Sequence, residues 1–510
     1  MEYTEEILMI SFLAAVALLI IGYLTYGKVV EKNFGPDSRE TPAIRLNDGV
    51  DYVPMPTWKV FLIQLLNIAG TGPIFGALGG ALFGPIVYLW IVFGCIFAGA
   101  VHDYNCGMLS ARHNGASVSE LTGLYLGKGL KQLMRVFSVI LLVMCGVVFT
   151  VGPAGLLELL NPGLLSENTW LLIISLYYFI ATFVPIDKVI GHLYPLMGIC
   201  LVVMALGVAS SMLFSGQFVM PELWDHFENM HAAGTDVWPF LFITVACGAI
   251  SGFHATQSPM MARCIKSEKN GRLVFYGAMI AEGLIALIWA AAGVTVYESS
   301  QALLDAGGGC SAVVYHICQS TMGQFGIILA LLGVIACPIS SGDTAYRSAR
   351  LTLADWFKLD QSSIKNRLIL TLPLLLAGSI ICKLNYSIVW RYFSWANQTL
   401  AMITLWAISV YLRKEKKNHY ITAIPALFMS AVTVTYFVSA PECLGVLWST
   451  LGLPYEVYYP AGIVCGIVAA LTFLGIFRDF TFVRTVISDI SSQRESRRQR
   501  KDSGKNSGKG

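Results

Sequence analysis

Long apolar runs recur from one end of this 510-residue chain to the other, and they constrain the fold more than any other feature. A helix of about 20 apolar residues spans a bilayer core roughly 30 Å thick. Because lipid offers no hydrogen-bond partners, such a helix must satisfy its own backbone N–H and C=O groups. Charged residues make up 13% of the chain, against about 25% in soluble domains. The sequence therefore predicts an all-α polytopic membrane protein.

The apolar runs predict about 13 transmembrane helices. They lie at 7–27, 58–79, 84–106, 131–152, 169–186, 189–214, 237–258, 272–297, 322–343, 367–383, 387–411, 420–440 and 458–477. Lys and Arg gather in alternate loops, while Glu and Asp dominate the opposite set. The positive-inside rule then predicts an N-terminus outside the cell and a C-terminus in the cytoplasm.

Two of these spans, the second and the seventh, are interrupted by glycine, proline and polar residues. The first interruption reads Gly70-Thr-Gly-Pro73, and the second reads Ser251-Gly-Phe-His254. Matched breaks in two halves of a chain indicate the binding site of a secondary transporter. The loop charges make the first broken helix enter from the cytoplasm and the second, five helices later, from outside. This pattern predicts a LeuT/APC-like 5+5 inverted repeat.

The predicted organisation has six parts. They are an N-terminal extra helix (1–30), a cytoplasmic loop (31–57), a first five-helix repeat (58–214), a second, inverted five-helix repeat (237–411), a C-terminal two-helix addition (412–487) and a disordered basic cytoplasmic tail (488–510). Binding to anionic lipid is the alternative interpretation of the tail. The acidic N-terminus predicts a first membrane span rather than a cleaved signal peptide.

The breaks and the polar residues near them are the candidate solute site. Freed N–H groups at a broken helix suit an anionic solute group, and freed carbonyls suit a cation. The alternative is packing: Gly and Pro are common in membrane helices, and amides also form interhelical hydrogen bonds. The candidate substrate-binding residues are Asn67, Gly70, Thr71, Gly72, Ser251, Gly252, His254, Gln257, Asn397 and Gln398.

Ionisable residues inside the predicted spans are candidates for coupling transport to an ion. Asp103, His254 and Glu282 are costly to bury without a role, and histidine titrates near physiological pH. The alternative for His254 is a neutral side chain hydrogen-bonded within the bundle. Ser340 and Ser341, on the eighth helix of the predicted core, are sodium candidates together with the backbone of Ala69. Small residues that ease helix contact are the other interpretation.

Three acidic residues are candidates for a gate at the cytoplasmic face. Asp48 and Asp51 lie in the loop before the first broken helix, and Asp343 lies near the inner end of the ninth span. We expect Asp343 to pair with a neighbouring arginine, although ordinary helix-end chemistry explains it equally well. Because charge is tolerated at this depth, these positions suit an ion pair that opens and closes.

Enzyme, metal and nucleotide motifs are absent from the sequence. It has no GxxxxGK[ST] phosphate loop, no HExxH and no cysteine pair at metal-binding spacing. We therefore expect no enzyme activity, no cofactor, no metal and no nucleic-acid partner; the expected partners are a solute, H⁺ or Na⁺, and the lipid bilayer. Most of the 12 cysteines fall in apolar spans. One disulfide remains open among Cys310, Cys318 and Cys443, which fall in predicted external loops, and the sequence leaves undecided whether two of them pair.

Several motifs along the chain resemble those of one known family. They are Asp37-Ser-Arg-Glu-Thr-Pro running to Pro54, Ala98-Gly-Ala-Val-His-Asp-Tyr104, Arg112-His-Asn-Gly-Ala-Ser117, Ser251-Gly-Phe-His-Ala-Thr-Gln-Ser-Pro259 and Trp395-Ala-Asn-Gln398. This set resembles the carbon starvation protein A (CstA) family over almost the whole chain, in a shorter form. The resemblance implies uptake of peptides, or of pyruvate in some relatives, across the bacterial inner membrane when carbon is scarce. It also implies membership of the amino acid–polyamine–cation superfamily.

The sequence thus favours a secondary active transporter that imports small peptides or a small carboxylate such as pyruvate by H⁺- or Na⁺-coupled alternating access. A membrane nutrient sensor or a channel-like protein on the same fold is the alternative. A sensor usually carries a soluble signalling domain, and a channel needs no inverted repeat. The predicted inverted repeat and the short predicted tail both favour the transporter over these alternatives.

Overall fold

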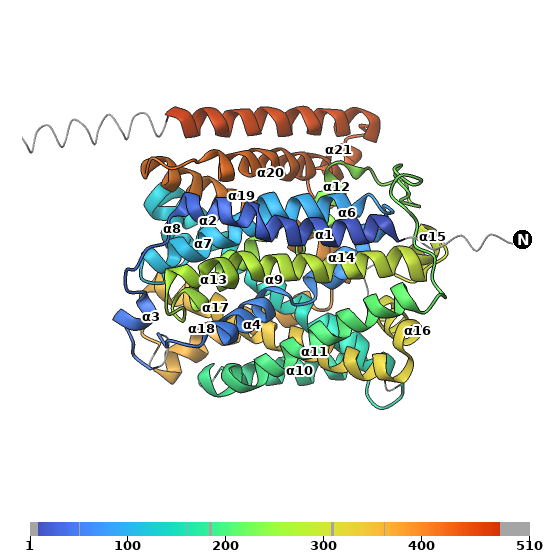
Figure 1. Cartoon of the computed structure of the whole chain (residues 1–510), viewed down its shortest axis with the longest axis horizontal. Helices are drawn as coiled ribbons and strands as arrows, with labels where there is room; N and C mark the ends of the chain where they lie inside the picture. The colour runs from blue at the N-terminus through green and yellow to red at the C-terminus, as the bar shows by residue number, and fades with distance from the viewer. Residues whose placement is uncertain are drawn as a thin grey trace, which may run out of the picture.

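The computed structural model describes residues 9–49, 52–160, 162–182, 186–307, 311–361 and 363–479. Helices dominate these residues, and no strand occurs among them. Most of the long helices run roughly along one direction as a bundle (Figure 1). This confirms the all-α prediction.

The first half of the bundle extends to the loop that follows α11. Its helices are α1 (Ile10–Leu24), α2 (Tyr26–Phe34), α3 (Pro42–Arg45), α4 (Thr57–Ile68), η1 (Gly72–Gly76), α5 (Ala77–Ala81), α6 (Val87–Leu89), η2 (Trp90–Gly99), α7 (Ala100–Arg112), α8 (Val118–Leu126), α9 (Lys128–Leu160), α10 (Glu167–Ala181) and α11 (Ile186–Phe214). η1 and η2 are π-helical segments continuous with the α-helices that follow them.

The second half begins at α12. Its helices are α12 (Val237–Thr244), α13 (Gly252–Ala262), η3 (Glu268–Asn270), η4 (Arg272–Gly277), α14 (Ala278–Val296), α15 (Ser300–Asp305), α16 (Ser311–Ala330), η5 (Leu331–Ala336), α17 (Cys337–Phe357), α18 (Ile364–Ile381), α19 (Tyr386–Lys414), α20 (Tyr420–Ser439) and α21 (Gly445–Thr450). A C-terminal helix, Tyr455–Asp479, completes the described chain.

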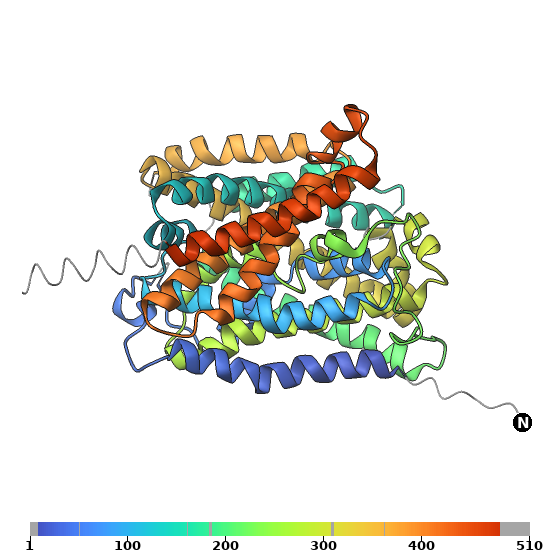
Figure 2. The ribbon, with the colours of Figure 1, turned by 90° about the horizontal axis from the view of Figure 1, so that it is seen from above.

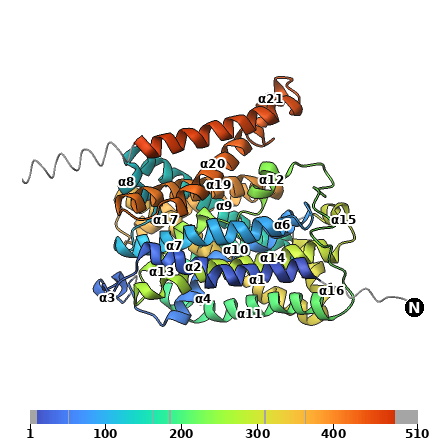
Figure 3. The same cartoon turned by 45° about the horizontal axis from the view of Figure 1, so that its top comes forward.

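Among the described residues, eight helices are long and apolar enough to cross a membrane, and two bent helix pairs bring the number to ten. The three other predicted spans correspond to α10, to the pair α12 and α13, and to α19, which are also helical. The first helix and the C-terminal helix are among the least buried, and they run along the outside of the bundle (Figures 2 and 3). Their apolar surfaces therefore face lipid.

Both predicted breaks are present. Helix α4 ends at Ile68, and the chain resumes at Gly72 after a bend of 54°. Helix α12 ends at Thr244, and α13 begins only at Gly252. Figure 1 shows that α4 starts at the end of the bundle where α3 lies, whereas α12 starts at the opposite end, near α15. The two broken helices therefore run in opposite directions, and we call these two ends the α3 end and the α15 end.

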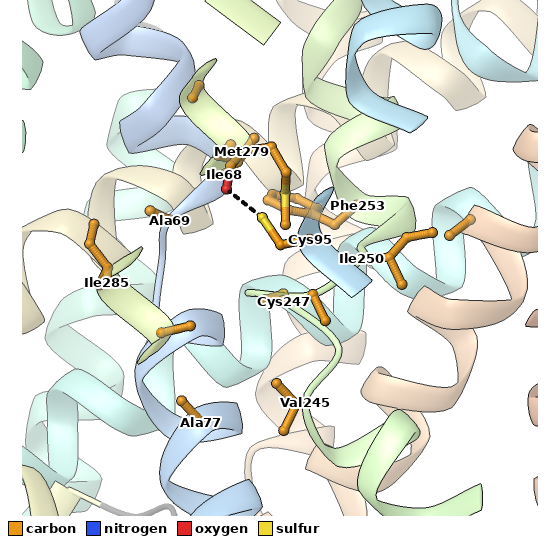
Figure 4. Packing of buried hydrophobic residues seen from close by; sticks show 14 of the residues in the cluster. Ile68, Ala69, Ala77, Cys95, Val245, Cys247, Ile250, Phe253, Met279 and Ile285 are labelled. Atoms are coloured by element: carbon orange, nitrogen blue, oxygen red, sulfur yellow. Dashed lines mark hydrogen bonds between the residues drawn. The ribbon is translucent and has the colours of Figure 1, made fainter. Parts of the chain in front are cut away.

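The two breaks touch each other in the interior of the bundle (Figure 4). A β-carbon placed on Gly72 would lie 2.4 Å from both Cβ and Sγ of Cys247. One placed on Gly76 would lie 3.0 Å from the carbonyl oxygen of Thr244. Glycine is the residue that lets two backbones approach this closely. The glycines of the first break are therefore needed for its contact with the second.

The ninth predicted span, 322–343, was too short at both ends. In the structure the segment Ser311–Leu329 is followed by Gly333–Phe357, with a bend of 73° between them. Cys318 is consequently buried inside α16 rather than exposed in a loop. Cys318 and Cys443 are both free thiols, and Cys310 lies outside the described residues. The polar residues between 311 and 321 hid the start of this helix.

Replacing Gly252 by alanine tests the close packing of the second break. A β-carbon there would lie 2.4 Å from the Asn397 carbonyl oxygen and 2.6 Å from the Ala401 nitrogen. Both are backbone atoms, which do not swing aside, so we expect Gly252→Ala to destabilise the protein by about 1–3 kcal/mol or more. The measurement is the unfolding temperature of the purified protein in detergent.

The matched control is Gly129→Ala in α9, where a new β-carbon meets no atom within 4 Å. Alanine favours a helix more than glycine does, so this variant should keep or raise the unfolding temperature. Equal unfolding temperatures for Gly252→Ala and the wild type would contradict the packing argument.

Candidate functional site

A buried polar cluster lies against the second break. It consists of His102 and Asp103 on α7, Cys247 in the break, His254 on α13 and Glu282 on α14. The two histidines and the two carboxylates are 0% exposed. The proximity of Cys247 to the first break at Gly72 joins this cluster to both interruptions. The structure therefore brings together all three predicted proton-coupling residues, Asp103, His254 and Glu282.

The four ionisable side chains form a line of contacts. Asp103 Oδ1 lies 2.8 Å from His102 Nδ1, and Asp103 Oδ2 lies 2.7 Å from His254 Nδ1. On its other side, His254 Nε2 lies 3.3 Å from Glu282 Oε2. Because each carboxylate faces a histidine, neither acid is buried without a partner, which would be strongly unfavourable.

The contact between His254 and Glu282 has two chemically distinct forms. When Nδ1 of His254 donates to Asp103, a cationic ring also donates from Nε2 to an ionised Glu282. A neutral ring with the same Nδ1–H leaves Nε2 as an acceptor, which suits a protonated Glu282. A third arrangement, neutral His254 beside ionised Glu282, places two acceptors face to face. The separation of 3.3 Å is an ion-pair distance, and neither His254 Nε2 nor the two Glu282 oxygens has a hydrogen-bond partner among the described residues.

Two amides of α19 hold the ends of the second break. Asn397 Oδ1 accepts hydrogen bonds from the Phe253 amide at 2.6 Å and from the Ser251 hydroxyl at 3.1 Å. Gln398 Nε2 donates to the Phe242 carbonyl at 3.0 Å. These bonds satisfy backbone groups that the missing helical turns leave open. Asn397 therefore supports the start of α13, and Gln398 supports the end of α12.

The first break is held from α17. The Ser341 hydroxyl donates to the Leu66 carbonyl at 3.2 Å, and the Cys337 thiol donates to the Ala69 carbonyl at 3.5 Å. Ser340 donates instead to the Cys337 carbonyl of its own helix, at 2.7 Å. Of the predicted sodium residues, the structure thus brings Ser341 and Ala69 to the same contact between α4 and α17. Carbonyl and hydroxyl oxygens meet there.

Several buried polar atoms have no hydrogen-bond partner among the described residues. They include Asn67 Oδ1, Thr71 Oγ1, Gln257 Oε1, Gln398 Oε1 and both amide atoms of Gln64. Such atoms are uncommon in folded proteins, and each one needs an explanation. Asn67, Thr71, Gln257 and Gln398 are predicted substrate-binding residues, so a polar solute or water would satisfy them. Gln64 lies one helical turn before Asn67 on α4 and was missed, although a glutamine in an apolar span was a usable signal.

The two described gate candidates, Asp343 and Asp48, make their contacts outside this cluster. Asp343 Oδ2 lies 3.2 Å from Arg347 Nη2, one turn further along α17, as expected for an ion pair. Asp48 Oδ1 accepts a hydrogen bond from the Tyr52 amide at 2.9 Å within its own loop. Asp51 lies outside the described residues.

A buried acid that the sequence analysis missed lies at the α3 end. Glu268 is 2% exposed, and its carboxylate oxygens lie 2.9 and 3.0 Å from Nη2 and Nε of Arg112. Glu268 also accepts from the Asp37 amide at 3.1 Å, while Arg39 hydrogen-bonds Asp37 and holds the pKa of that carboxyl well below its usual range. The usable signal was an acidic residue inside the basic loop 263–272.

One part of the cluster also has donors suited to a divalent cation. Cys247, His254 and Glu282 offer sulfur, nitrogen and oxygen atoms that all lie within 4.8 Å of one another. Such a mixed set suits transition metals. The direct contact between His254 and Glu282 accounts for the same geometry as an ion pair, so the arrangement does not require a metal.

Sequence comparison assigns most of the chain to one family. Residues 7–161, 156–308 and 295–436 match the family described as carbon starvation protein CstA. An uncharacterized membrane protein of Haemophilus influenzae is 44% identical over 355 residues, which cover 59% of this chain and 95% of that protein. The peptide transporter CstA of Escherichia coli is 24% identical over 564 residues, with coverage of 83% and 79%.

A further relative and a solved structure extend the comparison. The pyruvate/proton symporter BtsT of Escherichia coli is 27% identical over 341 residues, covering 54% of this chain and 47% of that protein. Among solved structures, an inward-facing conformation of Mhp1 aligns with a TM-score of 0.48 and 15% identity, covering 86% of this chain and 96% of Mhp1.

Replacing Asn397 by alanine tests the support of α13. The change removes the acceptor of the Phe253 amide and leaves a buried donor unsatisfied, which costs about 1–3 kcal/mol. We expect a lower unfolding temperature for Asn397→Ala in detergent. The control is Gln132→Ala, which removes an exposed amide from α9. An unfolding temperature equal to that of the control would show that Asn397 does not stabilise the break.

Proposed function

Because the chain belongs to the carbon starvation protein CstA family, we propose that it is a secondary active transporter that imports small peptides or a small carboxylate such as pyruvate. Curated relatives named as a peptide transporter and as a pyruvate/proton symporter support these solute classes. A bundle of apolar helices supports a multi-pass membrane protein. The proposed setting is the bacterial inner membrane during carbon starvation.

The observation that carries this proposal is the meeting of two helix breaks beside a buried polar cluster. In a membrane, non-helical backbone is tolerated where it is buried in protein or lines a cavity. Transporters place solute and coupling ions at such breaks near the middle of the bilayer. The direct contact of Gly72 with Cys247 supports a single site that both broken helices build.

In the proposed site, the solute is bound by backbone groups of the two breaks and by the side chains between them. Gly70, Gly72 and Gly252 contribute backbone atoms, while Asn67, Thr71 and Gln257 contribute polar atoms that otherwise have no protein partner among the described residues. Ser251, Asn397 and Gln398 hold the second break in shape. A peptide or a carboxylate offers both donors and acceptors that match these groups.

We propose that the coupling proton is held between His254 and Glu282, with Asp103 fixing the orientation of His254. Loss of the proton would leave two acceptors facing each other and would push Glu282 away from His254. That movement would change the contact between α13 and α14, which border both breaks. Sodium is the alternative coupling ion, with the Ala69 carbonyl and the hydroxyls of Ser340 and Ser341 as its candidate ligands.

The proposed orientation places the N-terminus outside and the C-terminus in the cytoplasm, so the α3 end faces the cytoplasm. Asp48, Asp51 and Asp343 remain candidates for the inner gate. The buried pair of Arg112 and Glu268 joins them, because it closes the same end of the bundle. Opening toward the cytoplasm would then require these ion pairs to separate.

Uptake into proteoliposomes tests the proposal. Labelled dipeptides and labelled pyruvate are each offered under a proton gradient, under a sodium gradient and without a gradient. We expect accumulation of one solute class under one gradient. Absence of uptake of both solutes under both gradients would overturn the assignment.

Charge-removing substitutions in the cluster test the coupling residues. Glu282→Gln keeps the size of the side chain but removes its titratable proton, so we expect proton-driven accumulation to fall to the level of protein-free vesicles. Exchange of solute across the membrane without a gradient should persist, because it needs no net proton movement. His254→Ala and Asp103→Asn should also lose the dependence on pH.

The control is Asp305→Asn, which changes an exposed carboxylate at the end of α15. It should accumulate solute like the wild type. If Glu282→Gln, His254→Ala and Asp103→Asn all kept proton-driven accumulation, these three residues would have no part in coupling.

A further inference from the structure

A cavity of about 410 Å³ lies at the α15 end, separate from the buried polar cluster. Ligand sites in proteins commonly have volumes of about 300–1,000 Å³. The side chains that define the cavity for the present argument are Phe75, Phe83, Phe240, Trp390, Arg391 and Glu442. They come from η1, the turn after α5, α12, the start of α19 and the loop after α20. We call this cavity the vestibule.

The vestibule ends at the first break. Phe75 lies three residues after Gly72, and its ring centroid is 6.2 Å from that of Trp390. A β-carbon placed on Gly76 would lie 3.4 Å from the Trp390 ring. Phe75 is 2% exposed and Trp390 9% exposed, so both rings are buried where they line the vestibule. Phe75 belongs to η1, which begins at Gly72, one of the residues proposed to bind the solute.

The vestibule carries one accessible positive charge. Arg391 and Glu442 are the charged side chains that line it. Nε of Arg391 lies 3.2 Å from Glu442, whose side chain is 4% exposed and also accepts from the Tyr436 hydroxyl. Arg391 itself is 45% exposed. Burial lowers the pKa of His231, another lining residue, and so disfavours a second positive charge in the vestibule.

Arg391 has the chemistry to recognise a carboxylate. Its contact with Glu442 uses Nε, and within the described part of the chain no hydrogen bond engages its two terminal amino groups. Those groups form the fork that binds a carboxylate through two parallel hydrogen bonds. Glu442 neutralises part of the charge and holds the guanidinium in place. The aromatic wall suits the apolar part of a small solute.

We propose that the vestibule is an outer binding site in which Arg391 binds the carboxylate of the incoming solute before the rings of Phe75 and Trp390 separate. This inference rests on the proposed function, because it assumes that solute passes from the α15 end to the breaks. The recognised chemistry is a free carboxylate, which a dipeptide and pyruvate share. The neighbouring aromatic side chains favour solutes that also carry an apolar group.

Binding to the purified protein tests the site without transport. Trp390 lines the vestibule, so its fluorescence should change when a dipeptide with a free carboxylate is added. The same dipeptide with an amidated C-terminus should give no change up to about tenfold higher concentration, because a charge-assisted pair is lost. Pyruvate is the second ligand with a free carboxylate, and its binding is measured in the same way. Equal binding of the acid and the amide by the wild type would overturn the inference without any variant.

Variants locate the effect at Arg391. We expect Arg391→Gln to raise the half-saturating concentration of the free acid about tenfold or more, in binding and in uptake. Arg391→Lys keeps the charge but loses the fork, so it should fall between the wild type and Arg391→Gln. Lys383→Gln, which removes an exposed positive charge that is bound to Asn168 and does not line the vestibule, should behave like the wild type. Unfolding temperatures confirm that each variant is folded.

The outcomes separate the two proposals. Wild-type affinity in Arg391→Gln, with uptake intact, overturns the vestibule site and leaves the transporter assignment standing. Acid-specific binding that Arg391→Gln abolishes, without uptake of any solute by the wild type, supports the binding site and overturns the transport assignment. No binding of either free acid to the wild type overturns the vestibule site.

Discussion

The backbone groups freed at two helix breaks are the constraint on which the rest of this structure depends. In a bilayer these groups have no water to bind, so protein must surround them. The chain meets this requirement by placing one break against the other and by supplying side chains from α17 and α19. Helix α17 hydrogen-bonds the first break through Ser341, and α19 hydrogen-bonds the second through Asn397 and Gln398. The breaks and these two helices form one unit.

The buried charged side chains also need protein partners, because lipid cannot solvate them. Asp103 and Glu282 lie on either side of His254, so the imidazole partners two acids that would otherwise be very costly to bury. His102 completes the environment of Asp103. A helix that carried any one of these groups alone would be poorly tolerated in lipid. Helices α7, α13 and α14 therefore depend on one another through their polar residues as well as through apolar packing.

The sequence predicted the architecture well because a lipid environment strictly limits which backbone structures can span it. The lengths of the apolar runs predicted the helices, and glycine and proline within them predicted the breaks. The charges in the loops indicated that the broken helices run in opposite directions. The convergence of Asp103, His254 and Glu282 was not predictable, because contacts between distant helices leave no local pattern. Glu268 was overlooked because loops normally solvate their charges. The early start of α16 was missed because His316, Gln319, Ser320 and Thr321 interrupt the apolar residues of its first turns.

The stretch between α2 and α4 has a mechanical consequence. The Thr41 hydroxyl donates to the Ile265 carbonyl, the Met55 amide donates to the Cys264 carbonyl, and the Asp37 amide donates to Glu268. The chain leading into one broken helix is thus fastened to the chain leaving the other. A tilt of α13 would therefore displace the start of α4. These hydrogen bonds couple the movements of the two interrupted helices.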